Sequence, residues 1–323
     1  MGVSFMKSII YFILFLLSCQ TGFTHDRVVL QLQWFPQAQF AGFLISEANG
    51  FYRDHDLDVD IQFGGPGISP FDSLIHKKAT FCTGWLAEGI ARCAGGAPIV
   101  NIAQLVQRSG LMFISKKSSN ILKPEDMNGK TIGLWMQDFL IQPTIFIQKE
   151  NIKANLESQA YSIDPFLRGA FDVVSAMYYN EYHRVYEAGL DKTDIVTFWF
   201  ADYDLNYPED GIYCSLETWS SSNELCRKFI AASLKGWEWA FTNKQKAVDI
   251  VMDYCMACNV ATSRNHQEWM LSAMEELMKI DNNGEIQIQV KSSDFNQILR
   301  QLKEFHLIKN EIEYDNFYSS GVK

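Results

Sequence analysis

The sequence predicts an α/β protein of two lobes, each built on a mainly parallel sheet flanked by helices, with two crossing strands as the hinge. Two observations predict this class. Apolar residues alternate with polar ones over short runs, and helical stretches separate these runs. The series stops in a polar segment at residues 116–126 and starts again at residue 130. A series that is interrupted and then resumed favours two α/β units over one.

The first unit opens with a strand at Val28–Trp34, where apolar side chains occupy alternate positions. Residues 37–49 follow as a helix, and Gly50 is placed to end it. The same patterns predict the remaining elements, which are a strand at 57–63, a helix at 71–77, a strand at 79–83, a helix at 86–94, and strand-like runs at 99–107 and 111–115.

The second unit begins with a strand at 130–135 and continues to about residue 213. Ser221-x-x-Glu224 then predicts a capping box that opens a long helix of the returning first unit. A strand over 286–290 and a helix over 293–305 complete the chain. The expected division is lobe 1 at 26–117 and 214–323, lobe 2 at 118–213, and crossing strands near 111–118 and 210–217.

The N-terminal residues predict export. Lys7 precedes an uninterrupted apolar run at 9–17, which is about half the ~20 residues that a transmembrane helix needs. Residues 1–19 therefore read as a signal peptide. Leu16–Cys19 resembles the lipobox of bacterial lipoproteins, so we expect lipidation of Cys19, with cleavage after Thr24 as the alternative. The expected location is the periplasm or cell surface, anchored to the membrane by that lipid.

Composition narrows the classes of partner. The chain has 323 residues, 47% of them hydrophobic, and a formal net charge of −10. No dense stripe of Lys and Arg is present, so we expect no nucleic-acid partner. Six Cys besides Cys19 would lie in a compartment that permits disulfides, with their pairing open. The Cys255-x-x-Cys258 pair is read as small, partly buried helix residues in preference to a redox or metal site.

Several phrases of the sequence resemble the periplasmic substrate-binding proteins of ABC transporters. The nearest branch is the one that binds or makes the pyrimidine precursor of thiamine. This resemblance implies a type II periplasmic-binding fold, a small heteroaromatic ligand, an ABC permease as partner, and a monomer. The phrases that carry it are Gln33–Gly42, Glu47–Tyr52, Leu57–Val59, Lys123–Gly133, Lys235–Ala240 and Ala247–Met252.

The expected site lies at the carboxyl ends of the strands, where open α/β sheets bind ligands. Aromatic faces and a few polar groups there suit a flat heteroaromatic ring. In the resembling family a Glu after the last strand of the inserted lobe holds the amino-pyrimidine edge. Glu181 stands in that place, although a solvated residue in the first turn of a helix is an equal alternative. The expected ligand-binding residues are Trp34, Gln37, Gly65, Trp85, Trp135, Tyr178 and Glu181.

The family also contains an enzyme branch that makes the pyrimidine from pyridoxal phosphate and a histidine of its own. That branch needs a Lys and, four residues later, a His, but this chain has Gly84 and Glu88 there. We therefore expect a binding protein without a cofactor; a pyrimidine synthase with a relocated Lys and a sensory receptor remain open. The pair His183 and Glu187 lacks a third ligand, so no metal site is expected.

The ligand's identity also stays open. The family's usual Asn and His in the first loop appear here as Gln37 and Phe40. A thiamine-type pyrimidine is one candidate, and flavins or other heteroaromatic compounds suit a cleft lined by Trp equally well.

Overall fold

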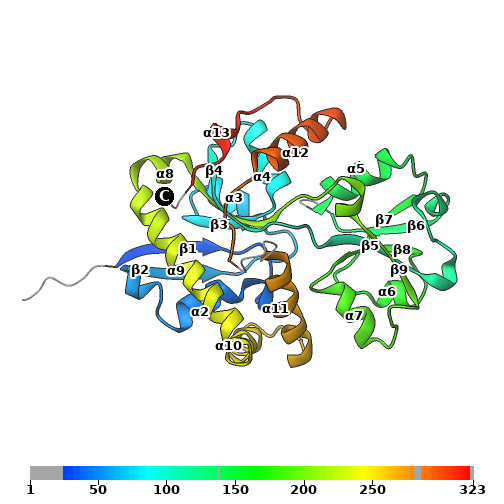
Figure 1. Cartoon of the computed structure of the whole chain (residues 1–323), viewed down its shortest axis with the longest axis horizontal. Helices are drawn as coiled ribbons and strands as arrows, with labels where there is room; N and C mark the ends of the chain where they lie inside the picture. The colour runs from blue at the N-terminus through cyan, green and yellow to red at the C-terminus, as the bar shows by residue number, and fades with distance from the viewer. Residues whose placement is uncertain (1–24, 137–138, 279–284, 321–323) are drawn as a thin grey trace, which may run out of the picture.

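The computed structural model describes residues 25–136, 139–278 and 285–320 and shows two lobes, each with a five-stranded sheet (Figure 1). The predicted two-lobed α/β fold is confirmed, although both sheets are mixed. The first sheet has the order β2-β1-β3-β10-β4 and contains β1 Asp26–Gln31, β2 Leu57–Gln62, β3 Phe81–Gly84, β4 Ile99–Val106 and β10 Glu209–Ser215. The second sheet has the order β7-β6-β8-β5-β9 and contains β5 Leu111–Lys116, β6 Thr131–Leu134, β7 Asn155–Ser158, β8 Val173–Met177 and β9 Ile195–Trp199.

One strand of each sheet runs against the others. β10 pairs antiparallel with β3 and β4, and β5 pairs antiparallel with β8 and β9. All other pairs are parallel. The chain forms β5 directly after it passes from the first lobe to the second, and it forms β10 directly after it returns. Each of these two strands therefore begins at the end of its sheet that faces the cleft.

Helices cover both sheets. In the first lobe α2 packs against α9 and α10, while α12 packs against α4 (Figure 1). The first-lobe helices are α2 Ala41–Ala48, α3 Pro70–Ile75, α4 Leu86–Ala94, α8 Leu216–Ser221, α9 Asn223–Thr242, α10 Lys244–Ala257, α11 Arg264–Met278, α12 Ser292–Glu304 and α13 Tyr314–Phe317. The second-lobe helices are α5 Ile141–Lys149, α6 Asp164–Leu167 and α7 Glu181–Glu187. Short 3₁₀ turns lie at Ala38–Phe40, Arg53–His55, Lys117–Ser119, Pro124–Met127 and Phe200–Tyr203.

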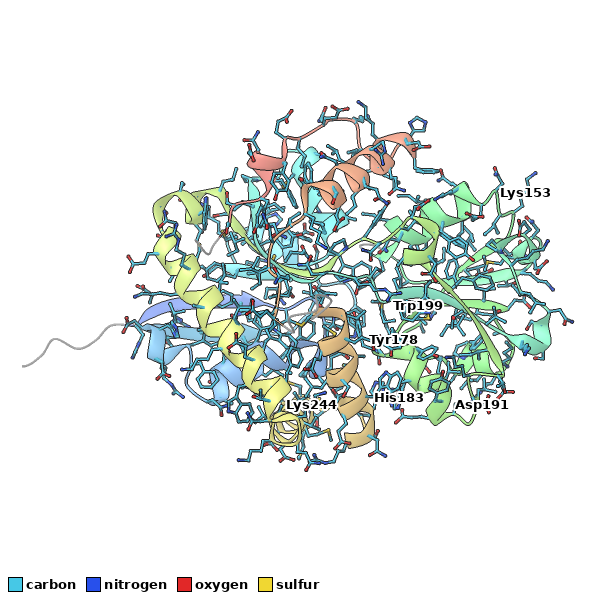
Figure 2. All side chains as sticks on the ribbon, in the orientation of Figure 1. Lys153, Tyr178, His183, Asp191, Trp199 and Lys244 are labelled. Carbon is cyan, nitrogen blue, oxygen red and sulfur yellow. The ribbon has the colours of Figure 1, made fainter. Side chains whose placement is uncertain are left out.

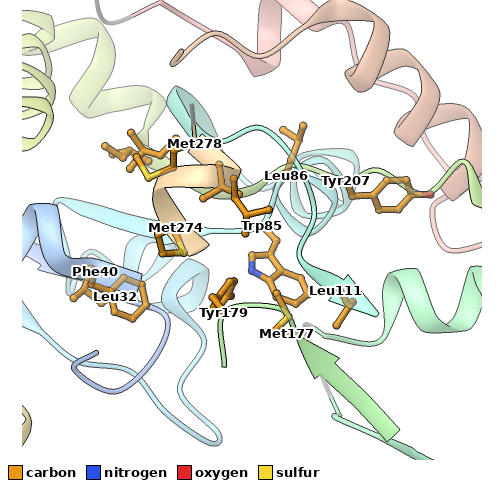
Figure 3. Packing of buried hydrophobic residues seen from close by; sticks show 14 of the residues in the cluster. Leu32, Phe40, Trp85, Leu86, Leu111, Met177, Tyr179, Tyr207, Met274 and Met278 are labelled. Atoms are coloured by element: carbon orange, nitrogen blue, oxygen red, sulfur yellow. The ribbon is translucent and has the colours of Figure 1, made fainter. Parts of the chain in front are cut away.

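A hydrophobic core continues from one lobe into the other beneath the cleft. Leu32, Phe40 and Met274 of the first lobe belong to the same buried cluster as Leu111 and Met177 of the second (Figure 3). Burial of this apolar surface is the main favourable term for holding the lobes in this arrangement. Among the described residues, no helix has the length and apolar character needed to cross a bilayer.

The structure divides the chain at points that differ from the expected boundaries. Residues 111–116 form β5 of the second sheet, and residues 209–213 belong to β10 of the first sheet. The passages between the lobes are therefore the short segments 107–110 and 200–208. Residues 111–116 and 209–213 were both expected to be strands. Their periodicity cannot say which sheet each strand joins, because that depends on pairing with residues far along the chain.

A buried carboxyl group ties these two passages together. Glu209 Oε1 accepts hydrogen bonds from Ser109 Oγ at 2.7 Å and from the Gly110 amide at 2.9 Å. Asn206 Oδ1 in the other passage accepts from the Ser109 amide at 2.9 Å. Burial raises the pKa of Glu209 well above its ordinary value, and the neighbouring Asp210 carboxyl adds to this shift.

Two local predictions are wrong. Residues 285–290 have no strand; they run as irregular chain beside β4, where the Gln104 amide donates to Ile288 O at 2.8 Å. Ser221 does not cap α9, because it ends α8 and its Oγ donates to Glu217 O at 2.8 Å. The capping pattern gives no sign of the short helix α8 that precedes α9, and this hydroxyl belongs to α8.

The six described Cys are free thiols.

A candidate ligand-binding cleft between the lobes

The best-defined candidate site is a cleft between the lobes at the carboxyl ends of the strands. The segment after β1, the residue before α4 and the segments after β6 and β8 converge there because parallel strands end at one edge of their sheet. The lining residues are Gln33, Trp34, Gln37, Gln39, Trp85, Trp135, Phe139, Tyr161, Met177, Tyr179, Asn180 and Glu181.

Aromatic rings from both lobes meet in this cleft. Trp34 of the first lobe lies 4.5 Å from Tyr161 and 5.7 Å from Phe139 of the second, measured between ring centroids. Trp85 lies 4.9 Å from Phe139 in an edge-to-face arrangement. Rings at such spacings can part and stack on an inserted flat ring. The cavity left between them is about 40 Å³, which holds a few waters but no heteroaromatic ring, so a ligand of that size has to separate these side chains.

A chain of buried amides forms the polar floor of the cleft. Gln37 Nε2 donates to Gln39 Oε1 at 2.5 Å, and Gln39 Nε2 donates to Asp210 Oδ2 at 2.9 Å and to the Tyr179 hydroxyl at 3.0 Å. Gln33 Nε2 donates to Asp210 Oδ1 at 2.5 Å. Burial raises the pKa of Asp210 to about 6, while the bonds from Gln39 and Gln33 oppose that shift. The Gln39–Tyr179 bond joins the two lobes directly.

Apart from the Trp85 Nε1 donor, which interacts with the Asp210 carboxyl group, two buried polar atoms on the lining residues have no protein partner among the described residues. They are the Gln33 Oε1 acceptor and the Trp135 Nε1 donor. A buried polar group without a partner costs about 1–3 kcal/mol, so such groups are rare unless a ligand or water completes them. One free acceptor and one free donor fit the edge of a polar heterocycle.

Glu181 is buried at the first turn of α7, with 6% of its surface exposed. Its Oε2 accepts from the Met177 amide at 3.0 Å, and its Oε1 accepts from Asn180 Nδ2 at 2.9 Å. Burial raises its pKa to about 7, against the opposing effect of the Met177 and Glu181 backbone amides and of the Arg184 charge. The solvated alternative is therefore wrong, and the carboxyl group can either donate or accept a proton near neutral pH.

The structure brings most of the predicted site residues together. Trp34, Gln37, Trp85, Trp135 and Glu181 line the cleft. Gly65 lines an adjoining pocket that shares Trp34 and Trp85 with it. Tyr178 lies outside both pockets; its ring packs on Trp199 and Trp269, and its hydroxyl donates to Glu276 Oε2 at 3.1 Å (Figure 2). Tyr179 takes the inward position, where its hydroxyl accepts from Gln39 Nε2.

Several lining residues were not singled out from the sequence. Gln33 and Gln39 lie inside the phrase Gln33–Gly42, and Tyr179 and Asn180 lie between the expected site residues Tyr178 and Glu181, but nothing in the sequence ranks them above their neighbours. Phe139 and Tyr161 carried no signal, since they follow β6 and β7 at loop positions. Asp210 lies far along the chain from the glutamines that it binds, and only the sheet pairing of β10 places it behind them.

The NMT1/THI5-like family model matches residues 37–247 of this chain. The chain belongs to the NMT1/THI5-like family. It is 25% identical over 296 residues to the formylaminopyrimidine-binding protein of Halalkalibacterium halodurans, covering 85% of this chain and 86% of that one. It is 22% identical over 246 residues to the riboflavin-binding protein RibY of Chloroflexus aurantiacus, covering 72% and 67%.

Solved structures share the fold. The periplasmic aliphatic sulphonate-binding protein SsuA of Escherichia coli superposes with a TM-score of 0.70 at 9% identity, covering 92% of this chain and 93% of that one. At this identity the likeness concerns the fold alone. The chain therefore has the fold of periplasmic binding proteins.

The positions that the enzyme branch would use lie in the adjoining pocket. A Cβ on Gly84 would lie 2.4 Å from the Phe71 ring, so a Lys at this position would require that ring to move. Glu88 Oε1 accepts from Arg92 Nε at 2.5 Å, one turn along α4. None of the described residues that line this pocket is a Lys that could form an imine with pyridoxal phosphate.

Glu181 predicts a measurable pH dependence of stability. Because its folded pKa is raised to about 7, the folded state holds a proton that the unfolded state releases, and stability is lost as the pH rises through that value. From about pH 5 to about pH 7 we expect the free energy of unfolding to fall by about 2 kcal/mol more in the native chain than in Glu181→Gln. Urea unfolding of both proteins across this range measures the difference; parallel curves would contradict the raised pKa. The raised pKa of Asp210 also makes stability fall as the pH rises, but Asp210 is present in both proteins, so its contribution cancels in the comparison.

Proposed function

We propose that this protein binds a small planar heteroaromatic ligand, in the class of the aminopyrimidine precursors of thiamine, and delivers it to an ABC importer. The observation that carries the proposal is the pairing of aromatic rings from both lobes with one buried carboxyl group, Glu181, in a single cleft. Rings from opposite lobes favour a flat ligand whose binding holds the lobes closed.

The protonation of Glu181 supports an aminopyrimidine edge in particular. Such an edge presents an amino N–H donor beside a ring-nitrogen acceptor. A carboxyl group whose pKa is about 7 can accept from the amino group and donate its proton to the ring nitrogen. The two relatives named above bind a formylaminopyrimidine and riboflavin, which are both planar nitrogen heterocycles.

A pyrimidine synthase is the less favoured alternative, because Gly84 and Glu88 replace the Lys and His of the enzyme branch. Incubation with pyridoxal phosphate separates the two functions. We expect no imine absorbance, whereas a band that disappears on borohydride treatment would overturn the non-catalytic assignment.

The partners follow from the binding function. We propose that a monomer, tethered to the membrane by a lipid on Cys19, presents its ligand to an ABC permease. Cys19 lies outside the described residues, and mass determination of the mature N-terminus tests its modification. Genes for a permease and an ATPase beside this one would favour transport, and a neighbouring membrane kinase would favour sensing.

Native mass spectrometry of the purified chain is the direct test of the ligand class. We expect a co-purified heterocycle, or 1:1 binding when a panel of 4-aminopyrimidines, a formylaminopyrimidine and riboflavin is added. Calorimetry ranks the panel by affinity. Failure of every planar nitrogen heterocycle, together with binding of a sulphonate or another non-aromatic solute, would contradict the proposal.

A further inference from the structure

A cluster of three potential metal ligands joins the lobes beside the cleft. His183 and Glu187 lie one turn apart on α7 of the second lobe, and His266 on α11 of the first lobe faces them. His183 lies where α7 approaches α11 (Figure 2). The ligand atoms of the three residues all lie within 4.8 Å of one another. The third ligand missing from the sequence pattern thus comes from a residue about 80 positions away.

Hydrogen bonds orient His266 as metal-binding histidines are oriented. Asn180 Nδ2 donates to Glu181 Oε1, which leaves Asn180 Oδ1 to face His266 Nε2 at 2.9 Å. An amide oxygen only accepts, so Nε2 carries the proton. The lone pair of His266 Nδ1 then accepts from His183 Nδ1, and the His183 proton has to move to its Nε2 when an ion binds. Fixing one ring nitrogen through a hydrogen bond so that the other is free for a metal is the usual arrangement around protein metal ions.

His183 completes the pair. Its Nδ1 lies 2.9 Å from His266 Nδ1, and its ring stacks on Trp269 with centroids 4.9 Å apart and planes 18° apart. Two imidazole nitrogens bound to one tetrahedral Zn²⁺ at about 2.0–2.1 Å are about 3.3 Å apart, so a shift of a few tenths of an ångström makes room for the ion.

Glu187 supplies the charged ligand. Its Oε2 lies 3.9 Å from His266 Nδ1, and its Oε1 accepts from Ser263 Oγ at 2.8 Å, a bond that also comes from the first lobe. The competing cation is Arg184, whose Nη1 lies 3.1 Å from the same Oε2. Both side chains of that pair are about one-third exposed, and such pairs contribute little, so an ion can displace the guanidinium.

We propose that His183, Glu187 and His266 form a site for a divalent transition-metal ion of the Zn²⁺ class, which bridges the two lobes. Two imidazole nitrogens and one carboxylate oxygen suit such an ion, with water completing the coordination, and suit Mg²⁺ or Ca²⁺ poorly. Because the ligands come from both lobes, the bound ion holds α7 against α11 and favours the closed arrangement. Asn180 contacts both His266 and Glu181, so the metal site adjoins the cleft.

Titration with Zn²⁺ alone tests the site without any cleft ligand, so its outcome is independent of the proposed function. We expect 1:1 binding to the metal-free mature chain carrying Cys258→Ser, which removes an exposed competing thiol. His183→Ala and His266→Ala should each weaken the affinity more than about tenfold. Glu187→Gln, at an exposed position, should weaken it without disturbing the fold. His76→Ala is the matched control, since that exposed imidazole contacts only the Asp72 carbonyl.

Small-angle X-ray scattering tests separately whether the bound ion bridges the two lobes. Zn²⁺ should lower the radius of gyration of the native chain and leave that of His266→Ala unchanged. Absence of Zn²⁺ binding, or equal affinity in the native chain, His183→Ala and Glu187→Gln, would overturn the site. Binding with an unchanged radius of gyration would overturn the bridge.

Discussion

Replacing Trp34 and Glu181 together by alanine is expected to lower the affinity for an aminopyrimidine ligand about a thousandfold. Loss of a stacking partner costs about 0.5–1.5 kcal/mol beyond the lost buried area. Loss of hydrogen bonds from a buried, ionisable carboxyl group costs about 1.5–3 kcal/mol. Together with the buried area that is lost, these two terms come to about 4 kcal/mol, which corresponds to three decades in the dissociation constant.

Calorimetry with the tightest ligand of the panel measures this loss. The double variant Trp239→Ala/Glu217→Ala is the matched control, because it removes the same residue types at positions that line neither pocket. We expect its affinity to stay within about threefold of the native value, since neither residue is placed to touch the ligand. Equal affinity of the native chain and the Trp34→Ala/Glu181→Ala variant would place the binding site elsewhere.

Gly236→Val is expected to lower the free energy of unfolding by about 3–4 kcal/mol. α2 and α9 approach so closely that a Cβ on Gly236 would lie 2.0 Å from the carbonyl oxygen of Gly42 and 2.1 Å from Ser46 Oγ. The carbonyl belongs to the backbone of a neighbouring helix, so relief requires the two helices to separate. Overpacking of this kind costs about 1–3 kcal/mol, more when backbone must move, and it exceeds the gain from removing a helical glycine.

Urea unfolding of Gly236→Val measures this cost. Ala231→Val introduces the same side chain on the exposed face of the same helix, and its effect should remain within about 0.5 kcal/mol. A difference between the two variants of less than about 1 kcal/mol would show that α2 and α9 can separate cheaply. Ligand affinity is a second readout. It should be retained in the folded fraction, because the helix contact lies away from the cleft-lining residues.

Sequence patterns located most elements because their causes are local. Alternation at Val28–Trp34 located β1, whose residues Val28 and Leu30 are fully buried, and the helix at 86–94 agrees with α4 to the residue. The failures share a different cause. The 286–290 run alternates like a strand and lies beside the edge strand β4, but it forms no ladder with that strand. Ser221 has a capping pattern, but its hydroxyl belongs to the end of α8. In each case the deciding contact lies outside the few residues that form the pattern.

The sequence alone determined the fold class, the family resemblance, and the cleft positions Trp34, Trp85, Trp135 and Glu181, since strand ends converge in any open α/β sheet. Only the tertiary structure decided that Asp210 lies behind the Gln33 and Gln39 side chains, that Tyr179 faces the cleft in place of Tyr178, and that His266 meets His183. These contacts join segments far apart in the chain. Their geometry follows from how two sheets and their crossing strands pack, which no local periodicity encodes.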